Sequence, residues 1–263
     1  MTLMVMLSAA AVMLMMAQFE PPHPSPVDAA LESIERAGVG LHAMTATIAY
    51  RKDDALLGGG ELRTGELVYD ANPEGSPRLA IAFEYRIDLG SNERREERKQ
   101  LVFDSGWIVE RDEAAKQFIK RQIVRPGDTA DPMRLGGPFP LPIGQKRADV
   151  ISRFEVSMLE PPPDRFAVPK PDSMTLTGLH LVPRAGSAEA EDWASIDLWY
   201  DQSTWLPVGV IATEVNGDQR RIRLIKTLTH KSLPEASASM LSIETPDEGW
   251  SVDVQPWVEA QDP

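Results

Sequence analysis

The chain has 263 residues, of which 42% are hydrophobic and 25% charged, a balance that excludes a wholly disordered protein. Its 40 acidic and 27 basic residues give a net charge of −13, which argues against a general nucleic-acid binder and against electrostatic docking to an anionic membrane. The absence of cysteine excludes disulfides, thiolate catalysis and zinc–thiolate sites.

The N-terminal segment indicates export. Residues 1–17 are apolar and carry no charged side chain. Because a membrane span needs about 20 apolar residues, this length favours a cleaved signal peptide, with an uncleaved N-terminal anchor as the alternative. We therefore expect a periplasmic or other cell-envelope location. Residues 18–25 are predicted to be a proline-rich linker, residues 26–255 a single domain and residues 256–263 a tail.

An amphipathic helix is predicted over residues 26–37. Ser25 and Asp28 have the spacing of a capping box, and Pro26 stands at the first helical position. The apolar residues that follow recur at helical spacing on one face. Gly38 and Gly40 are expected to end the helix.

Beyond this helix the hydrophobic pattern has the period of two that is typical of strands. Residues 79–87 alternate most clearly, and residues 101–109 read as a hairpin. An Asn-Gly pair at 216–217 predicts a further hairpin. Such segments predict about ten antiparallel strands, the last of them at 240–243 and 250–254. A sheet of this kind closes or curls around a core.

Residues 126–144 interrupt the strand pattern. Repeated proline excludes a central strand there, since proline cannot donate to the hydrogen-bond ladder. The stretch nevertheless carries Phe139, Leu141 and Ile143, so we expect an apolar covering or binding loop. A short helix is predicted to follow over residues 145–153.

The sequence contains no recognisable catalytic or cofactor-binding motif. It lacks a G-x-S-x-G elbow, a phosphate-binding glycine loop and H-E-x-x-H, and its four histidines are not spaced as metal ligands. Carboxylate pairs such as Asp53-Asp54 lie in polar turns, whereas a general acid needs a shielded position. We therefore expect no enzyme, no metal and no cofactor. An envelope enzyme with a site assembled from distant strands is the enzymatic alternative.

The order of these segments resembles the LolA-type family of periplasmic outer-membrane lipoprotein carriers. The similarity extends over residues 27–255, and each motif is by itself mostly strand and turn chemistry. The segments that carry it are the amphipathic helix, Gly65–Tyr69, Pro77–Phe83, Leu101–Trp107, Leu179–Pro183, Ile196–Asp201 with Leu206-Pro207, and Pro246–Val252. The chain departs from the family in the insertion at 126–144 and in extra length at 160–172.

The resemblance implies a mainly β fold, a curled and incompletely closed antiparallel barrel covered by an N-terminal helix and a mid-chain helix or loop lid. It implies a non-enzymatic transport chaperone that shields the acyl chains of lipoproteins or lipids in an apolar cavity, with membrane release and acceptor proteins as partners and no role for nucleic acid. In the family, an arginine beside a proline ties the lid. Arg78 is the nearest match, although here Pro77 precedes the arginine.

Six apolar residues are candidates for the cavity lining, and each of them equally fits an ordinary core position. They are Ile81, Phe83, Phe103, Trp107, Phe139 and Leu141. The alternative function is an envelope sensor or protein-interaction module on the same fold. That alternative predicts a filled interior and an exposed patch that faces a partner.

Overall fold

The computed structural model describes residues 24–56, 58–72, 76–128, 132, 142–160 and 174–258. The predicted signal segment and the loop residues Phe139 and Leu141 lie outside these residues.

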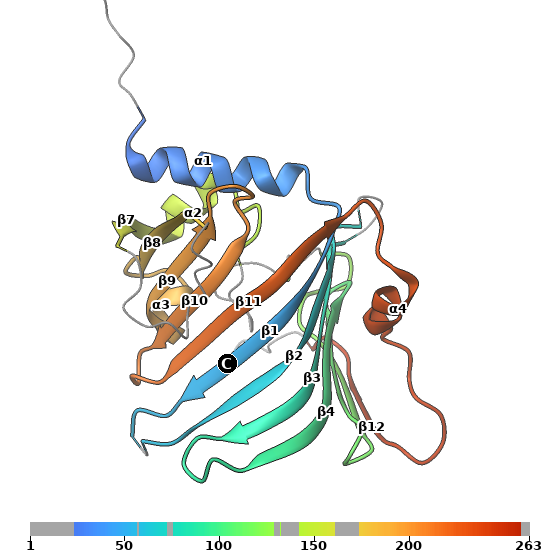
Figure 1. The fold of residues 1–263 in the computed structure, drawn as a ribbon. Coiled ribbons are helices and arrows are strands. Elements are labelled where there is room, and N and C mark those ends of the chain that lie inside the picture. Colours follow the sequence, from blue (N-terminus) through green and yellow to red (C-terminus); the bar gives the residue numbers. More distant parts are fainter. Residues whose placement is uncertain are drawn as a thin grey trace, which may run out of the picture.

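One sheet of twelve strands forms the body of the protein (Figure 1). In chain order its strands are β1 (Ala43–Asp53), β2 (Gly60–Asp70), β3 (Arg78–Asp88), β4 (Arg94–Asp104), β5 (Trp107–Asp112), β6 (Gln117–Gln122), β7 (Phe154–Leu159), β8 (Leu176–Pro183), β9 (Trp193–Asp201), β10 (Pro207–Glu214), β11 (Gln219–His230) and β12 (Ser251–Gln255). Their spatial order is β12-β6-β5-β4-β3-β2-β1-β11-β10-β9-β8-β7. Within the described residues no ladder joins β12 to β7, so the predicted mainly β, incompletely closed sheet is confirmed.

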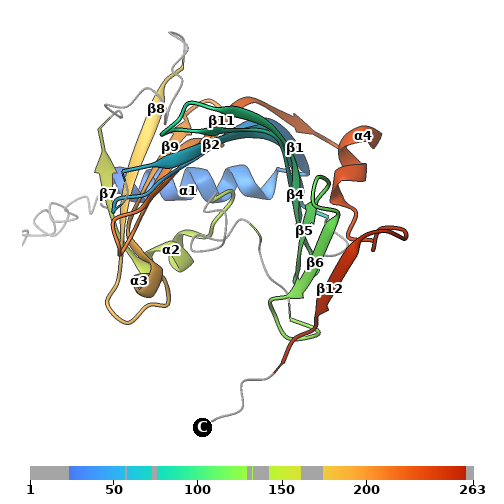
Figure 2. The same cartoon turned by 90° about the horizontal axis from the view of Figure 1, so that it is seen from below.

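The sheet curls into an arch, and α1 (Pro26–Val39) and α2 (Arg147–Arg153) lie on its inner side (Figure 2). Two shorter helices are α3 (Glu189–Asp192) and α4 (Glu235–Ala238). The predicted cap is present in α1, where the Asp28 backbone N–H donates to Ser25 Oγ at 3.1 Å. The predicted helices at 26–37 and 145–153 are thus confirmed, with small shifts of their ends.

The C-terminal segment corrects two predictions. Residues 240–243 are not a strand, because α4 runs into the 3-10 helix η1 (Ser239–Leu241). A strand would send Met240 and Leu241 to opposite faces, whereas the helical turn lets both pack against the outer face of the sheet. The final strand, β12, pairs with β6 in parallel and not antiparallel, because the chain first crosses that outer face.

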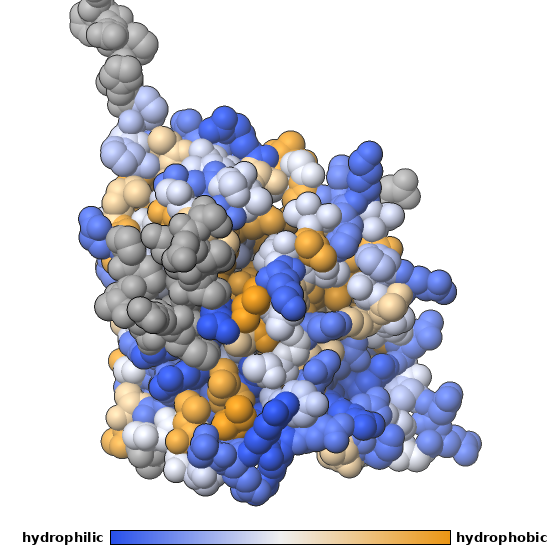
Figure 3. All heavy atoms as spheres, in the orientation of Figure 1, coloured by the Kyte–Doolittle hydropathy of each residue, from blue (hydrophilic) through white to orange (hydrophobic). Residues whose placement is uncertain are grey.

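The two faces of the arch carry separate apolar clusters. The inner cluster joins α1 and α2 to side chains from strands on both sides of the arch, including Ile48, Leu67, Ile81 and Leu198. The smaller outer cluster packs Val102 and other strand residues against Leu241. Hydrophilic side chains gather on the visible outer face over β2–β4 (Figure 3). The largest apolar surface of the sheet is therefore turned inward.

Irregularities in register help to curl the sheet. The β2–β3 register shifts between Thr64 and Gly65, and the β3–β4 register shifts between Phe83 and Tyr85. Such bulges bend a strand and increase its twist. A Cβ at Gly65 would lie 1.9 Å from the Ala82 carbonyl oxygen, so the backbones approach too closely here for any other residue.

Candidate functional site

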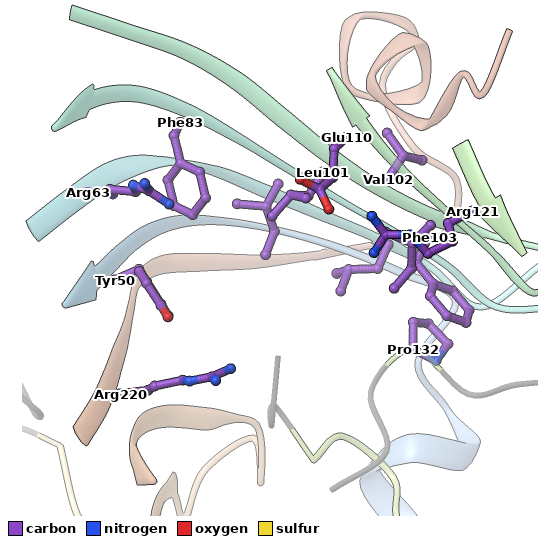
Figure 4. A pocket seen from close by; sticks show the side chains of 13 residues that line it. Tyr50, Arg63, Phe83, Leu101, Val102, Phe103, Glu110, Arg121, Pro132 and Arg220 are labelled. Atoms are coloured by element: carbon purple, nitrogen blue, oxygen red, sulfur yellow. The ribbon is translucent and has the colours of Figure 1, made fainter. Parts of the chain in front are cut away.

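A cavity of about 330 Å³ lies on the inner face of the sheet (Figure 4). An adjoining space of about 90 Å³ shares Arg63, Phe83, Leu101 and Glu110 with it and extends toward Ile119 on β6. The main cavity is lined by Tyr50, Arg63, Leu79, Ile81, Phe83, Leu101, Val102, Phe103, Ile108, Glu110, Arg121, Pro132 and Arg220.

The apolar wall of the cavity follows from strand alternation. Leu79, Ile81 and Phe83 alternate along β3 and share its inner face. Across the β3–β4 ladder, Leu79 is opposite Phe103 and Ile81 is opposite Leu101. Two neighbouring strands therefore present one continuous apolar surface to the cavity.

The cavity occupies only one half of the arch. On the β7–β10 side the inner face is covered by Ile143, Val150 and Phe154, which belong to the inner cluster. The Tyr200 hydroxyl on β9 donates to the Pro142 carbonyl at 3.1 Å and fixes the start of this segment. Burial raises the pKa of the Tyr200 hydroxyl well above its usual range, so it stays a donor. Among the described residues, this half acts as packed core, and the cavity lies in the β1–β6 half.

One end of the cavity is polar. The Tyr50 ring lies 6.1 Å from the Phe83 ring, and the Arg63 guanidinium lies 5.7 Å from the same ring centroid. Arg63 Nε lies 3.1 Å from Glu97 Oε2, while Arg220 Nε donates to Glu214 Oε1 at 2.6 Å. Figure 4 shows Tyr50 and Arg220 at the end of the cavity opposite Phe103 and Pro132.

The structure places the predicted lining residues in three groups. Ile81, Phe83 and Phe103 line the cavity, although their role in binding a ligand remains a prediction. Trp107 does not line it. Trp107 is the register partner of Asp104, and its side chain lies on the other face of the sheet, where Lys120 Nζ is 5.1 Å from the centroid of its ring. Phe139 and Leu141 lie outside the described residues.

Arg78 stands at the start of β3, where its side chain forms an ion pair with Asp70 of β2. The two residues are register partners, so this contact belongs to the sheet. A lid contact for Arg78 remains a prediction.

Sequence reasoning missed Tyr50 and Arg220, which lie at the polar end of the cavity. Tyr50 continues the alternation of Ile48 on β1, so the strand pattern predicts that its side chain lies on the inner face. The position of Arg220 depends on the pairing of β1 with β11, which joins segments far apart in the chain. No local signal predicts that pairing.

The described part of the chain lacks two further kinds of feature. It contains no helix long and apolar enough to cross a membrane. It also contains no cluster of three or more histidine, aspartate or glutamate side chains arranged to hold a metal ion.

No family model and no curated protein matches the chain. Similar solved structures include the MucA/MucB complex of Pseudomonas aeruginosa, at 15% identity and a TM-score of 0.47, with 80% of this chain and 59% of that chain covered. LprF from Mycobacterium bovis matches at 10% identity and a TM-score of 0.44, with 81% of this chain and 98% of that chain covered. A LolA superfamily protein from Nitrosomonas europaea matches at 11% identity and a TM-score of 0.35, with 80% of this chain and 96% of that chain covered. Since these TM-scores lie below 0.5, the function proposed below rests on the geometry of the chain itself.

Proposed function

We propose that the protein is a non-enzymatic carrier of the cell envelope that shields the acyl chains of a lipid or lipoprotein in the cavity of the arch. The apolar wall on β3 and β4 is the observation that carries this proposal. Each methylene group of an acyl chain exposed to water costs about 0.8 kcal/mol. A cavity of about 330 Å³ is within the range of small-molecule sites and replaces water with apolar side chains.

The helices on the open side of the arch suit a carrier that must also release its cargo. Arg147 of α2 forms an ion pair with Asp28 of α1, and its backbone N–H donates to Glu35 at 3.1 Å. Partly exposed ion pairs contribute little, commonly about 0–1 kcal/mol. This ion pair therefore adds little to the cost of opening, and we propose that these helices, with the preceding loop, act as the lid.

Export is part of this proposal. The apolar segment 1–17 acts as the signal, and its removal leaves the domain to work in the periplasm or envelope. Membrane release and acceptor proteins are the partners that a shuttle of this kind requires.

A second candidate function is an envelope sensor or interaction module. It is favoured by the edge strand β12, whose Val252 and Val254 side chains are 44% and 48% exposed. An exposed apolar edge strand is a template for pairing with another chain. On this alternative the arch presents β12 to a partner protein.

The test is native mass spectrometry of the protein purified from its own envelope fraction, with lipid extraction of any adduct. We expect bound acyl-containing species in the wild type. Ile108→Gln introduces an amide into the cavity wall and should reduce the bound fraction several-fold, since an unpaired buried amide costs roughly 1–3 kcal/mol.

Ile211→Gln is the matched control, because Ile211 is also a half-buried strand isoleucine but packs in the separate cluster around Trp199. It should retain the adduct. An empty wild-type protein that captures one specific partner would contradict the carrier and support the interaction module.

A further inference from the structure

The cavity lining has a charge that an acyl chain alone does not explain. Among the described residues that line it are three arginines, Arg63, Arg121 and Arg220, and one carboxylate, Glu110. The chain as a whole carries a net charge of −13. Arg63 lies 3.1 Å from a carboxylate oxygen of Glu61 and of Glu97, and Arg220 pairs with Glu214, so these partners offset part of the cost of placing cations beside an apolar wall. The lining therefore has the opposite charge balance to the rest of the protein.

Arg220 is held in position at the polar end of this cavity. It lies on β11, where Ile222 and Leu224 of the same strand belong to the inner cluster. Its Nε donates to Glu214 at 2.6 Å, and its guanidinium lies 5.1 Å from the ring centroid of Trp193, which is buried. The ion pair uses Nε, and a guanidinium has five N–H donors. A fixed guanidinium of this kind binds a second anion with little loss of side-chain entropy.

Arg63 and Tyr50 complete this polar end, which we call the head-group end and define by Tyr50, Arg63 and Arg220. Arg63 is the register partner of Tyr50 on the neighbouring strand. Burial raises the pKa of the Tyr50 hydroxyl; the charges of Arg220 and Arg63 act in the opposite direction, and those of Glu61 and Glu214 raise it further. The hydroxyl is therefore protonated at neutral pH, and Tyr50 lines the same end of the cavity as the two arginines.

We propose that the head-group end binds the anionic group, a phosphate or a carboxylate, of an amphiphile whose hydrocarbon chain lies along the apolar wall. This inference rests on the proposed carrier function and specifies its cargo. Arginine forms bidentate, charge-assisted bonds with both anions. The apolar wall begins at Phe83, beside Tyr50 and Arg63, and continues through Ile81 to Phe103, so head group and chain have adjoining sites in one cavity (Figure 4).

The experiment compares dodecyl phosphate, dodecanol and inorganic phosphate by isothermal titration calorimetry on the delipidated protein. We expect dodecyl phosphate to bind about tenfold or more tightly than dodecanol, as one charge-assisted hydrogen bond allows. Arg220→Gln should remove most of this preference. The control Arg223→Gln, on the same strand but between the inward-facing positions 222 and 224, should keep it.

The outcomes separate this inference from the proposed function. Equal affinity for dodecyl phosphate and dodecanol contradicts anion binding at the head-group end and leaves the proposed carrier function standing. Binding of neither amphiphile overturns both. Inorganic phosphate that binds as tightly as dodecyl phosphate identifies a free-anion site and overturns the inference. If Arg220→Gln does not fold, salt titration of the wild type replaces it: added salt should weaken dodecyl phosphate binding and not dodecanol binding.

Discussion

At the scale of single residues, Gly38 and Gly144 meet where α1 packs against the segment that leads into α2. A Cβ at Gly38 would lie 2.1 Å from the Gly144 Cα, and Gly144 itself has a φ of +62°. Neither glycine has room for a side chain. The close approach of two backbones explains why both positions are glycine, beyond the role of Gly38 near the end of the helix.

Gly38→Ala should therefore destabilise the protein by about 1–3 kcal/mol through overpacking. The measurement is the free energy of unfolding from a denaturant titration. Gly40→Ala is the control, because a Cβ at Gly40 meets no atom within 4 Å. Equal stability of the two variants would show that the α1 contact is looser than the structure indicates.

The residue scale also shows how far the sequence predicts the candidate site. Alternation in the clearest strand places Ile81 and Phe83 on one face, and both line the cavity. Trp107 was predicted to line it as well, but the turn after Asp104 places its side chain on the other face of the sheet. Because a one-residue change of parity sends a side chain to the other face, hairpin geometry and not residue type decides this position.

At the scale of elements, the α1–α2 contact depends on the charge of Asp28. Hydrogen bonds from Ser25 and Arg147 hold the pKa of this carboxyl below its ordinary value of 3.8. The unfolded chain titrates at the ordinary value, so the carboxylate stabilises the fold above that pH. This contribution is lost as the pH falls below 3.8 through the folded-state pKa.

Asp28→Asn should accordingly lower the melting temperature at neutral pH, and the difference from the wild type should disappear at acidic pH. Thermal unfolding followed by circular dichroism across the pH range measures this. Asp247→Asn, at an exposed position of the C-terminal segment, should leave the curve unchanged. A difference that persists below the folded-state pKa of Asp28 would show that its charge is not the cause.

The C-terminal segment 231–255 is a strap across the outer face of the sheet. Gln100 Nε2 donates to the Met240 carbonyl at 2.5 Å, and Arg111 Nη2 donates to the Glu244 carbonyl at 3.1 Å. Leu241 is 2% exposed and packs against Val68, Ala80 and Val102 in the outer cluster. The strap is thus part of the core.

Leu241→Ala should lower the free energy of unfolding by about 2–5 kcal/mol, the usual cost of a buried leucine. Leu228→Ala removes the same atoms from a side chain that is 58% exposed and should have a much smaller effect. Denaturant titration of both variants gives the comparison. If the two variants lose equal stability, the strap does not contribute to the core.

The sequence predicted the elements with local signals better than those that depend on distant contacts. The cap at Ser25 and the Asn-Gly turn at 216–217 locate α1 and the β10–β11 hairpin correctly. Within the strap, the strand at 250–254 was predicted, whereas the helical turns and the parallel pairing were missed because they are set by the surface on which the strap packs. Tertiary packing overrides local preference in such segments.

At the scale of the whole molecule, the described residues of the arch form a packed half and a half that holds the cavity, both on one sheet. The inner cluster spans both halves, whereas the cavity lies beside β3 and β4. A pattern of alternating strands predicts a curled sheet but not which part of its inner face the helices fill. That division depends on the short segment from Pro142 to α2, whose position is fixed by contacts such as that with Tyr200.

The strand order also has a consequence for how the protein folds. Strands β1–β6 are successive neighbours, as are β7–β11, so both meanders form from short-range hairpins. The two meanders join in the sheet through the β1–β11 ladder, which pairs Ala43 with His230. Closing so long a loop is slow, because its entropy is lost before the new contacts form. Docking of two preformed meanders is therefore the expected rate-limiting step, and chains halted before it would expose the unpaired edges of β1 and β11.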